Sequence, residues 1–200
     1  QGRLASVRDA AGRTIALVHD VHDRVVALDL PAPSGDGLVR RRLYRYDEQG
    51  DLVGVVDALG HAWSFEYVGH LLTRETLRNG FSFHFAYDGV GEDAWCVRTW
   101  GDGGVHDHVL SYDKQQHKTW VTNSLGHTTC YEMNVMGQVV CIVDPLGAVT
   151  QRRYDPHTLQ LVEVIDPLGS RAVRRYDAVG NLVELEAADG ATTTLRYRGN

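Results

Sequence analysis

The chain has 200 residues, of which 43% are hydrophobic and 23% charged, and its formal net charge at pH 7 is −6. This acidic balance argues against a nucleic-acid partner, because a nucleic-acid surface needs a concentrated positive field. The chain has 21 Gly and only 5 Pro, which indicates many tight turns rather than a disordered linker. No apolar run approaches the roughly 18 residues that a membrane helix needs, so we expect no membrane contact within this segment.

Two sequence marks recur in phase along the chain. The first is a Gly that closes a turn of the type D-x-L-G or D-G, and the second is an aromatic residue seven positions later, usually followed by Asp. Together they predict a tandem array of about eight to nine repeats of roughly 22 residues, which occupies residues 1–200 as a single domain. The marks that we assign as structural repeat positions are Gly60, Gly80, Gly126, Gly147, Gly169, Gly190, Tyr67, Tyr87, Tyr154, Tyr176 and Tyr197.

Each period is predicted to form two short strands. Residues 61–67 alternate aromatic with small or polar side chains, which places Trp63, Phe65 and Tyr67 on one face of a half-buried strand. Residues 81–87 repeat this alternation. The second strand of each period is a β-branched run after the Tyr-Asp turn. Such runs occupy residues 52–56, 138–143, 161–165 and 182–186. No segment reads as a helix of three turns or more, so the predicted fold class is all-β, built from tandem β-hairpins.

The turn residues have a physical explanation. An Asp side chain accepts a hydrogen bond from the backbone two residues on, and Gly takes a positive φ without strain. Pro145 and Pro167 set φ at the first central position of their turns. We expect each phased Tyr to stack on the Tyr of the neighbouring repeat while its hydroxyl stays in water.

The clusters richest in titratable side chains do not predict a reactive site. Residues 19–23 and 106–108 combine His with Asp, but nothing nearby supplies the four converging ligands of a zinc site. The chain lacks a G-x-S-x-G motif, and its Asp residues lie in turns where backbone capping explains them. We therefore expect no enzyme activity, no cofactor, and no catalytic, cofactor-binding or metal-binding residue.

The three cysteines, Cys96, Cys130 and Cys141, do not form a disulfide framework, because their number is odd and their spacing is unpaired. Each lies beside apolar residues and is expected to be a small buried hydrophobe. A ligand-binding role stays open, because stacked repeats often bind along their length and exposed aromatic side chains suit sugars or peptides. The alternative function is thus an extracellular adhesion or carbohydrate-binding array.

The repeat pattern resembles the Rhs, or YD-repeat, family. The family phrase is similar to YDEQGDLVGVVDALGHAWSFEY from Tyr46 and YDAVGNLVELEAADGATTTLRY from Tyr176. The resemblance implies a long curled sheet that forms a section of a hollow, cocoon-like shell, and this chain is expected to be a fragment of a larger shell. In bacterial members, which include type VI secretion effectors and C components of insecticidal toxin complexes, that shell encloses a C-terminal toxic domain.

The resemblance also implies partners and a destination. The partners would be the remainder of the shell, the enclosed toxin domain, and secretion spike or chaperone proteins. The protein would be made in the cytoplasm and then secreted or delivered to target cells. One family feature is missing: the self-cleavage motif resembles Asp-Pro-x-Gly-Leu-x-Gly-Gly, but Gly147 and Gly169 are followed by Ala148 and Ser170. We therefore assign no autoproteolytic residue.

Overall fold

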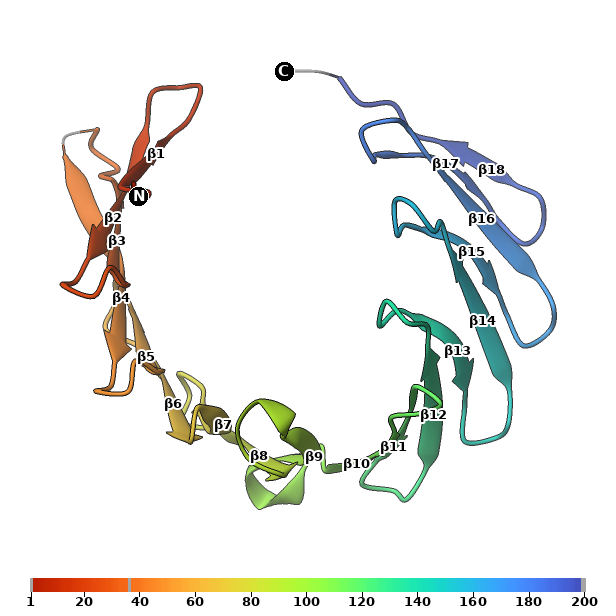
Figure 1. The fold of residues 1–200 in the computed structure, drawn as a ribbon. Helices are drawn as coiled ribbons and strands as arrows, with labels where there is room; N and C mark the ends of the chain where they lie inside the picture. The colour runs from red at the N-terminus through yellow and green to blue at the C-terminus, as the bar shows by residue number, and fades with distance from the viewer. Residues whose placement is uncertain (1, 36, 199–200) are drawn as a thin grey trace. The chain divides into compact units, whose positions relative to one another are not determined.

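The computed structural model describes residues 2–35 and 37–198, and it is all-β, which confirms the predicted fold class. Besides strands, the described residues form only two short 3₁₀ helices, η1 (Gly91–Asp93) and η2 (Asp102–Gly104) (Figure 1). The chain divides into two compact units, Gln1–Asp107 and His108–Asn200. The repeat marks run through both units.

The first unit is an antiparallel meander in which each strand pairs with the next along the chain. Its described residues form nine strands: β1 (Ser6–Arg8), β2 (Thr14–His19), β3 (Val25–Pro31), β4 (Leu38–Tyr46), β5 (Leu52–Asp57), β6 (Ala62–Val68), β7 (Leu71–Thr76), β8 (Ser82–Asp88) and β9 (Trp95–Gly101).

The second unit repeats this plan. Nine strands are again found in its described part: β10 (His108–Asp113), β11 (Lys118–Thr122), β12 (Thr128–Met133), β13 (Val139–Val143), β14 (Val149–Tyr154), β15 (Leu161–Ile165), β16 (Arg171–Tyr176), β17 (Leu182–Glu186) and β18 (Thr192–Thr194). The hairpin turns alternate between two edges of the meander.

The strands lie where the side-chain patterns predict them. In β6, Trp63, Phe65 and Tyr67 are half-buried while the residues between them are exposed, as the period-two alternation requires. The β-branched runs become β5, β13, β15 and β17, whose residues are half-buried or buried throughout.

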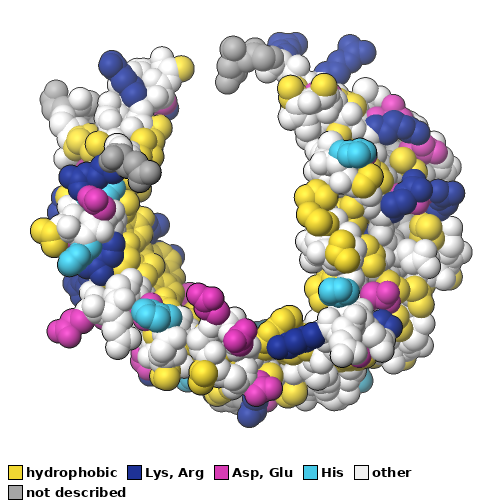
Figure 2. All heavy atoms as spheres, viewed as in Figure 1, with side chains coloured by type: hydrophobic (Ala, Val, Ile, Leu, Met, Phe, Trp, Pro, Cys, Tyr) yellow, Lys and Arg dark blue, Asp and Glu magenta, His cyan; other side chains and the backbone are white. Residues whose placement is uncertain are grey.

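Neither unit has a conventional hydrophobic core. Among the described residues, Ala27 is the only hydrophobic side chain that is fully buried, at 1% exposure. Each unit is a single antiparallel layer, so most side chains pack only against neighbours on their own face. Figure 2 shows hydrophobic side chains reaching the surface in both units. This arrangement corrects the prediction for Cys96, Cys130 and Cys141, which are half-buried rather than buried.

None of the helices in the described residues has the length and apolar character needed to span a membrane.

Candidate functional site

The turn that joins β15 to β16 illustrates how one repeat mark works. The Asp166 carboxylate accepts hydrogen bonds from the backbone N–H groups of Leu168 and Ser170, both at 2.8 Å. The Gly169 N–H donates to the Asp166 carbonyl at 3.0 Å, which closes the turn. The bond from Leu168, two residues after Asp166, is the one that the sequence predicts. The bond from Ser170, four residues after Asp166, fixes the path of the chain from the turn into the next strand.

All six glycines assigned as repeat positions have a positive φ, which L-residues adopt only with strain. The values are +85° for Gly60, +82° for Gly80, +79° for Gly126, +85° for Gly147, +84° for Gly169 and +84° for Gly190. The N–H of each donates to the carbonyl of the residue three positions earlier.

The phased tyrosines differ from the sequence-based expectation. Their hydroxyls do not simply stay in water, because four of the five donate to a backbone carbonyl fifteen residues earlier. These pairs are Tyr87–Leu72 at 2.8 Å, Tyr154–Val139 at 3.1 Å, Tyr176–Leu161 at 2.8 Å and Tyr197–Leu182 at 2.9 Å. The fifth, Tyr67, is half-buried, and this burial together with the nearby Asp51 and Asp47 carboxylates raises its pKa.

A β-bulge accompanies the second repeat mark. The strand register shifts at the aromatic position or its substitute in seven hairpins. These positions are His19, Tyr46, Tyr67, Tyr87, Met133, Tyr154 and Tyr176. A bulge bends the strand and increases its twist. The Tyr-Asp phrase therefore marks a bulged strand end as well as a turn.

A third repeating contact links successive Tyr-Asp turns along one edge. The Gln138 side-chain amide donates to the Leu159 carbonyl at 2.8 Å, and the Gln160 amide donates to the Gly180 carbonyl at 2.9 Å. In the first unit, Arg24 plays a similar part, with Nη1 3.5 Å from the Asp47 carbonyl and its guanidinium 4.7 Å from the Tyr46 ring centre.

The next contact along this edge of the first unit joins two side chains. Asp51 Oδ1 lies 2.8 Å from His70 Nδ1. We call these side chains turn staples: Arg24, Asp51, Gln138 and Gln160. The sequence analysis missed them, although each lies just after its Tyr-Asp-type turn and none is apolar.

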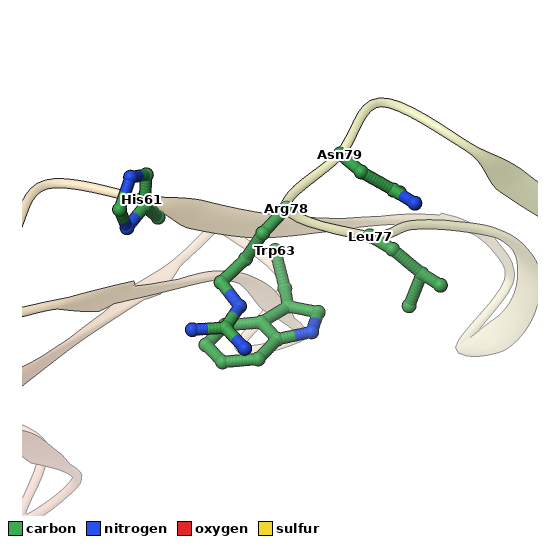
Figure 3. A pocket seen from close by; sticks show the side chains of 5 residues that line it. All are labelled: His61, Trp63, Leu77, Arg78 and Asn79. Atoms are coloured by element: carbon green, nitrogen blue, oxygen red, sulfur yellow. The ribbon is translucent and has the colours of Figure 1, made fainter.

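A shallow pocket of about 460 Å³ surrounds Trp63 in the first unit (Figure 3). The Arg78 guanidinium lies over the indole ring, 4.4 Å from its centre, and the Arg42 guanidinium is 5.2 Å from the same centre. His61, Leu77 and Asn79 complete the lining. Each guanidinium is attracted to the negative face of the indole ring.

Asp57 anchors this pocket. Its carboxylate accepts bonds from the Leu59 and His61 N–H groups at 2.9 and 3.0 Å, and Arg78 donates to it at 3.1 Å. Partial desolvation would raise the pKa of Asp57, but these backbone and side-chain donors outweigh it and lower the pKa to about 2. The carboxylate is therefore ionised at neutral pH and neutralises part of the guanidinium charge.

A Ser–His–Asp group in the first unit does not form a nucleophilic site. Ser82 is fully buried, and its hydroxyl lies within 3.2 Å of Arg74 and 3.0 Å of Thr76. His84 Nε2 contacts Asp102 at 3.0 Å, and Asp102 also accepts the Ser82 N–H at 2.8 Å. The group thus ties η2 to β8. The residues that the structure describes contain no cluster of three His, Cys, Asp or Glu side chains that could hold a metal ion.

Comparison with known proteins relates part of this geometry to a described repeat. A family model described as RHS Repeat matches residues 46–80, which run from the Tyr46 strand end to the Gly80 turn. The toxin protein Tse5 of Pseudomonas aeruginosa strain PAO1 is 28% identical over 235 residues, an alignment that covers 94% of this chain. Residues 46–80 of this chain are thus similar to an RHS repeat.

Two solved structures also resemble it. A crystal structure of TcdB2-TccC3-Cdc42 matches 93% of the chain at 11% identity with a TM-score of 0.45. A structure of the Photorhabdus luminescens Tc holotoxin pore matches 93% at 11% identity with a TM-score of 0.42. This chain spans 17% of Tse5 and 12% of each of these two toxin chains.

The matched RHS repeat contains one full set of the features described above. It begins at the bulged Tyr46, passes through the Asp47 turn, and continues along β5, β6 and β7. It includes the Asp57 turn and most of the Trp63 pocket. The matched range therefore begins at one sequence mark, Tyr46, and ends at another, Gly80.

Proposed function

We propose that this chain is a wall segment of a toxin's shell and that the complete shell encloses a C-terminal toxic domain. The observation that carries the proposal is the absence of a core: among the described residues one hydrophobic side chain is fully buried. A single-layer sheet presents two large faces and has no filled interior. A wall needs two such faces, so this architecture suits a wall.

The units offer surfaces of different chemistry, which suits a wall between solvent and contents. In the first unit, cross-strand pairing places Tyr44, Val55 and Trp63 in one row of one face. In the second unit, a polar face carries ion pairs in which Arg153 and Arg171 contact the buried Glu163. A half-buried aromatic surface can contact apolar polypeptide, while an ion-paired surface stays hydrated.

In this proposal the chain is not an enzyme. Turn carboxylates such as those of Asp57 and Asp166 are engaged by backbone N–H groups, and the Ser82 hydroxyl is buried against Arg74. The partners would be the rest of the shell and the enclosed toxin domain, with secretion spike or chaperone proteins during delivery. The similarity to a toxin along 94% of the chain supports delivery to target cells after synthesis in the cytoplasm.

Limited proteolysis of the complete natural gene product tests the proposal. We expect a segment downstream of the repeats to resist protease until mild denaturant opens the shell, with the surviving fragments identified by mass. A Gly169→Val variant of the same protein should expose that segment without denaturant, because the substitution strains a wall turn. A Gly169→Asn variant is the matched control. Immediate cleavage of the downstream segment in the parent protein, with the repeats intact, would contradict enclosure.

The second candidate function is carbohydrate binding in an adhesion array, and the Trp63 pocket favours it. The pocket combines an aromatic ring with the polar side chains of His61, Arg78 and Asn79. A pocket in which a few polar side chains accompany an aromatic ring is a common way to hold a small polar ligand. Saturable binding of a glycan to the isolated chain, lost in Trp63→Ala but retained in Trp100→Ala, would support this candidate. Absence of saturable binding across a glycan panel would remove it.

A further inference from the structure

Three consecutive hairpin turns at one edge of the second unit carry an exposed leucine at the same position. Leu125, Leu146 and Leu168 join β11 to β12, β13 to β14 and β15 to β16, with 76%, 93% and 92% of their surface exposed. Alternate turns of an antiparallel meander lie on one edge, two strands apart, so these side chains repeat about every 10 Å. We call this row the leucine edge.

The turns themselves do not require leucine. In the third turn, the structural bonds are made by the Asp166 carboxylate and the Gly169 N–H, and Leu168 contributes only its backbone N–H. Two other turns of this chain have Asn79 and Asp189 at the same position, directly before the closing Gly. Polar residues are the usual choice at a turn apex, so leucine is not needed to form these turns and its exposed side chain is available for contacts outside them.

The surroundings of the leucine edge are free of exposed charge at the apex. The residues before the three leucines are Ser124, Pro145 and Pro167, all exposed and uncharged. The Asp144 and Asp166 carboxylates are directed to the N–H groups of their own turns. The row is thus an apolar strip along the edge of the unit rather than three isolated side chains.

The opposite edge of the same unit carries exposed apolar side chains in two of its turns, on either side of the turn from β14 to β15, which carries His157 and Thr158. Val135 and Met136 lie in the turn between β12 and β13, and Val179 lies in the turn between β16 and β17, with 85%, 60% and 83% exposure. We call this row the valine edge. Both edges have the spacing of the same meander, so a leucine edge and a valine edge can lie side by side without losing register.

Backbone pairing cannot join two such edges. At a hairpin apex the backbone groups are already used, as in the bonds from Gly169 N–H to Asp166 and from Asp166 N–H to Ser170. Contact between edges must therefore come from side chains, and apolar side chains on both edges supply it.

We infer that the leucine edge of one chain is a docking surface for the valine edge of a second copy of this chain in solution. Because the two edges differ, the contact is heterologous, and each added copy leaves one edge of each kind free. The inference does not require that anything be enclosed. In a shell, the same contact would join neighbouring lengths of wall.

The test is sedimentation of the 200-residue chain over a range of concentrations. We expect the mass of the parent chain to rise with concentration beyond that of a dimer. The leucine-edge variant Leu125→Asn/Leu146→Asn/Leu168→Asn should weaken association by about tenfold or more, because burial of each leucine is lost. Asn is chosen because this chain has Asn79 at that position. The valine-edge variant Val135→Gln/Met136→Gln/Val179→Gln should behave alike.

Mixing the two variants provides the decisive step. Each retains one intact edge, so the mixture should form a 1:1 complex that does not grow further. Leu59→Asn, at the same turn position in the first unit, is the matched control and should associate like the parent. A parent chain that stays monomeric would overturn the inference. So would a leucine-edge variant that associates as well as the parent, because association would then run through exposed strands such as β18. Circular dichroism of each variant, together with the single variant Leu146→Asn, separates lost contact from lost folding.

Discussion

The hydroxyl of Tyr176 donates a hydrogen bond to the backbone carbonyl of Leu161, 2.8 Å away. Tyr176 ends β16, and Leu161 begins β15, the strand before it. The same bond, at the same separation of fifteen residues, joins Tyr154 to Val139. The phased tyrosine therefore fastens the end of one strand to the start of the preceding strand, at the edge where the Tyr-Asp turns lie.

Replacing Tyr176 with Phe should remove this bond and preserve the ring. We expect Tyr176→Phe to lower the free energy of unfolding by about 0.5–1.5 kcal/mol, the net value of a typical intramolecular hydrogen bond. Urea unfolding measures the change. Tyr131→Phe is the control, because the Tyr131 hydroxyl has no hydrogen-bond partner among the described residues, and it should leave stability nearly unchanged. Equal effects of the two substitutions would show that the hydroxyl bond contributes nothing.

The sequence predicts the turns better than the contacts between them. The hydrogen bond from Leu168 to Asp166 spans two residues, so its chemistry is visible in the local sequence. The bonds from Tyr176 to Leu161 and from Gln160 to Gly180 span fifteen and twenty residues. Their partners are backbone carbonyls, which every residue has, so no pattern of side chains identifies them. The prediction that the Tyr hydroxyl stays in water failed for this reason.

The bulges and the Trp63 pocket escaped prediction for a related reason. The alternation of side chains predicts which face Trp63 takes, but a register shift such as that at Glu66 and Tyr67 becomes visible only when two strands are paired. Arg42 and Arg78 reach Trp63 from β4 and from the turn after β7. The positions of Arg42 and Arg78 in the sequence do not indicate that both side chains contact the Trp63 ring.

Gly169 should be sensitive to substitution for conformational reasons alone. Its φ is +84°, and a Cβ built there would have no heavy atom within 4 Å, so space is not limiting. We expect Gly169→Val to destabilise the chain by roughly 1–2 kcal/mol or more, because L-residues are strained in this region and β-branching adds to the strain. Gly169→Asn should cost less, since Asn tolerates positive φ. Thermal unfolding that is the same for the Val variant and the parent would show that the turn does not constrain folding.

The Gln160 staple should stabilise the contact between neighbouring turns. Its side-chain amide donates to the Gly180 carbonyl at 2.9 Å, and both groups lie at the surface. We expect Gln160→Leu to destabilise the chain by about 0.5–1 kcal/mol and to speed amide hydrogen exchange in the turn at Gly180. Exchange in the leucine-edge turn at Gly169 should not change, which provides the internal control. Uniform acceleration across both turns would indicate general loosening rather than loss of the staple.

Asp57 should make stability depend on pH at the acid end. Its pKa is about 2 in the folded chain, below the usual 3.8, so its contribution is fully present above pH 3.8 and disappears as the pH falls through about 2. Asp57→Asn keeps the turn, as Asn123 does in the equivalent turn, but removes the charge that pairs with Arg78. The parent should exceed the variant in stability at pH 7, and the difference should vanish near pH 2. A difference that does not change between pH 7 and pH 2 would contradict the assignment.

His70 should make the opposite kind of contribution. Its imidazole bonds to the Asp51 carboxylate, with the charges of Asp51 and then Asp47 as further causes, and these raise the pKa of His70 above its usual 6.5. The stabilisation is therefore fully present below pH 6.5 and is lost as the pH rises through the raised pKa. Asp51→Asn should return the His70 pKa toward 6.5, as measured by NMR titration of the imidazole. In the parent, the turn around His70 should lose protection from amide exchange as the pH becomes alkaline, and in the variant this pH dependence should be absent. An identical His70 titration in the parent and the variant would show that the turn staple is not formed in solution.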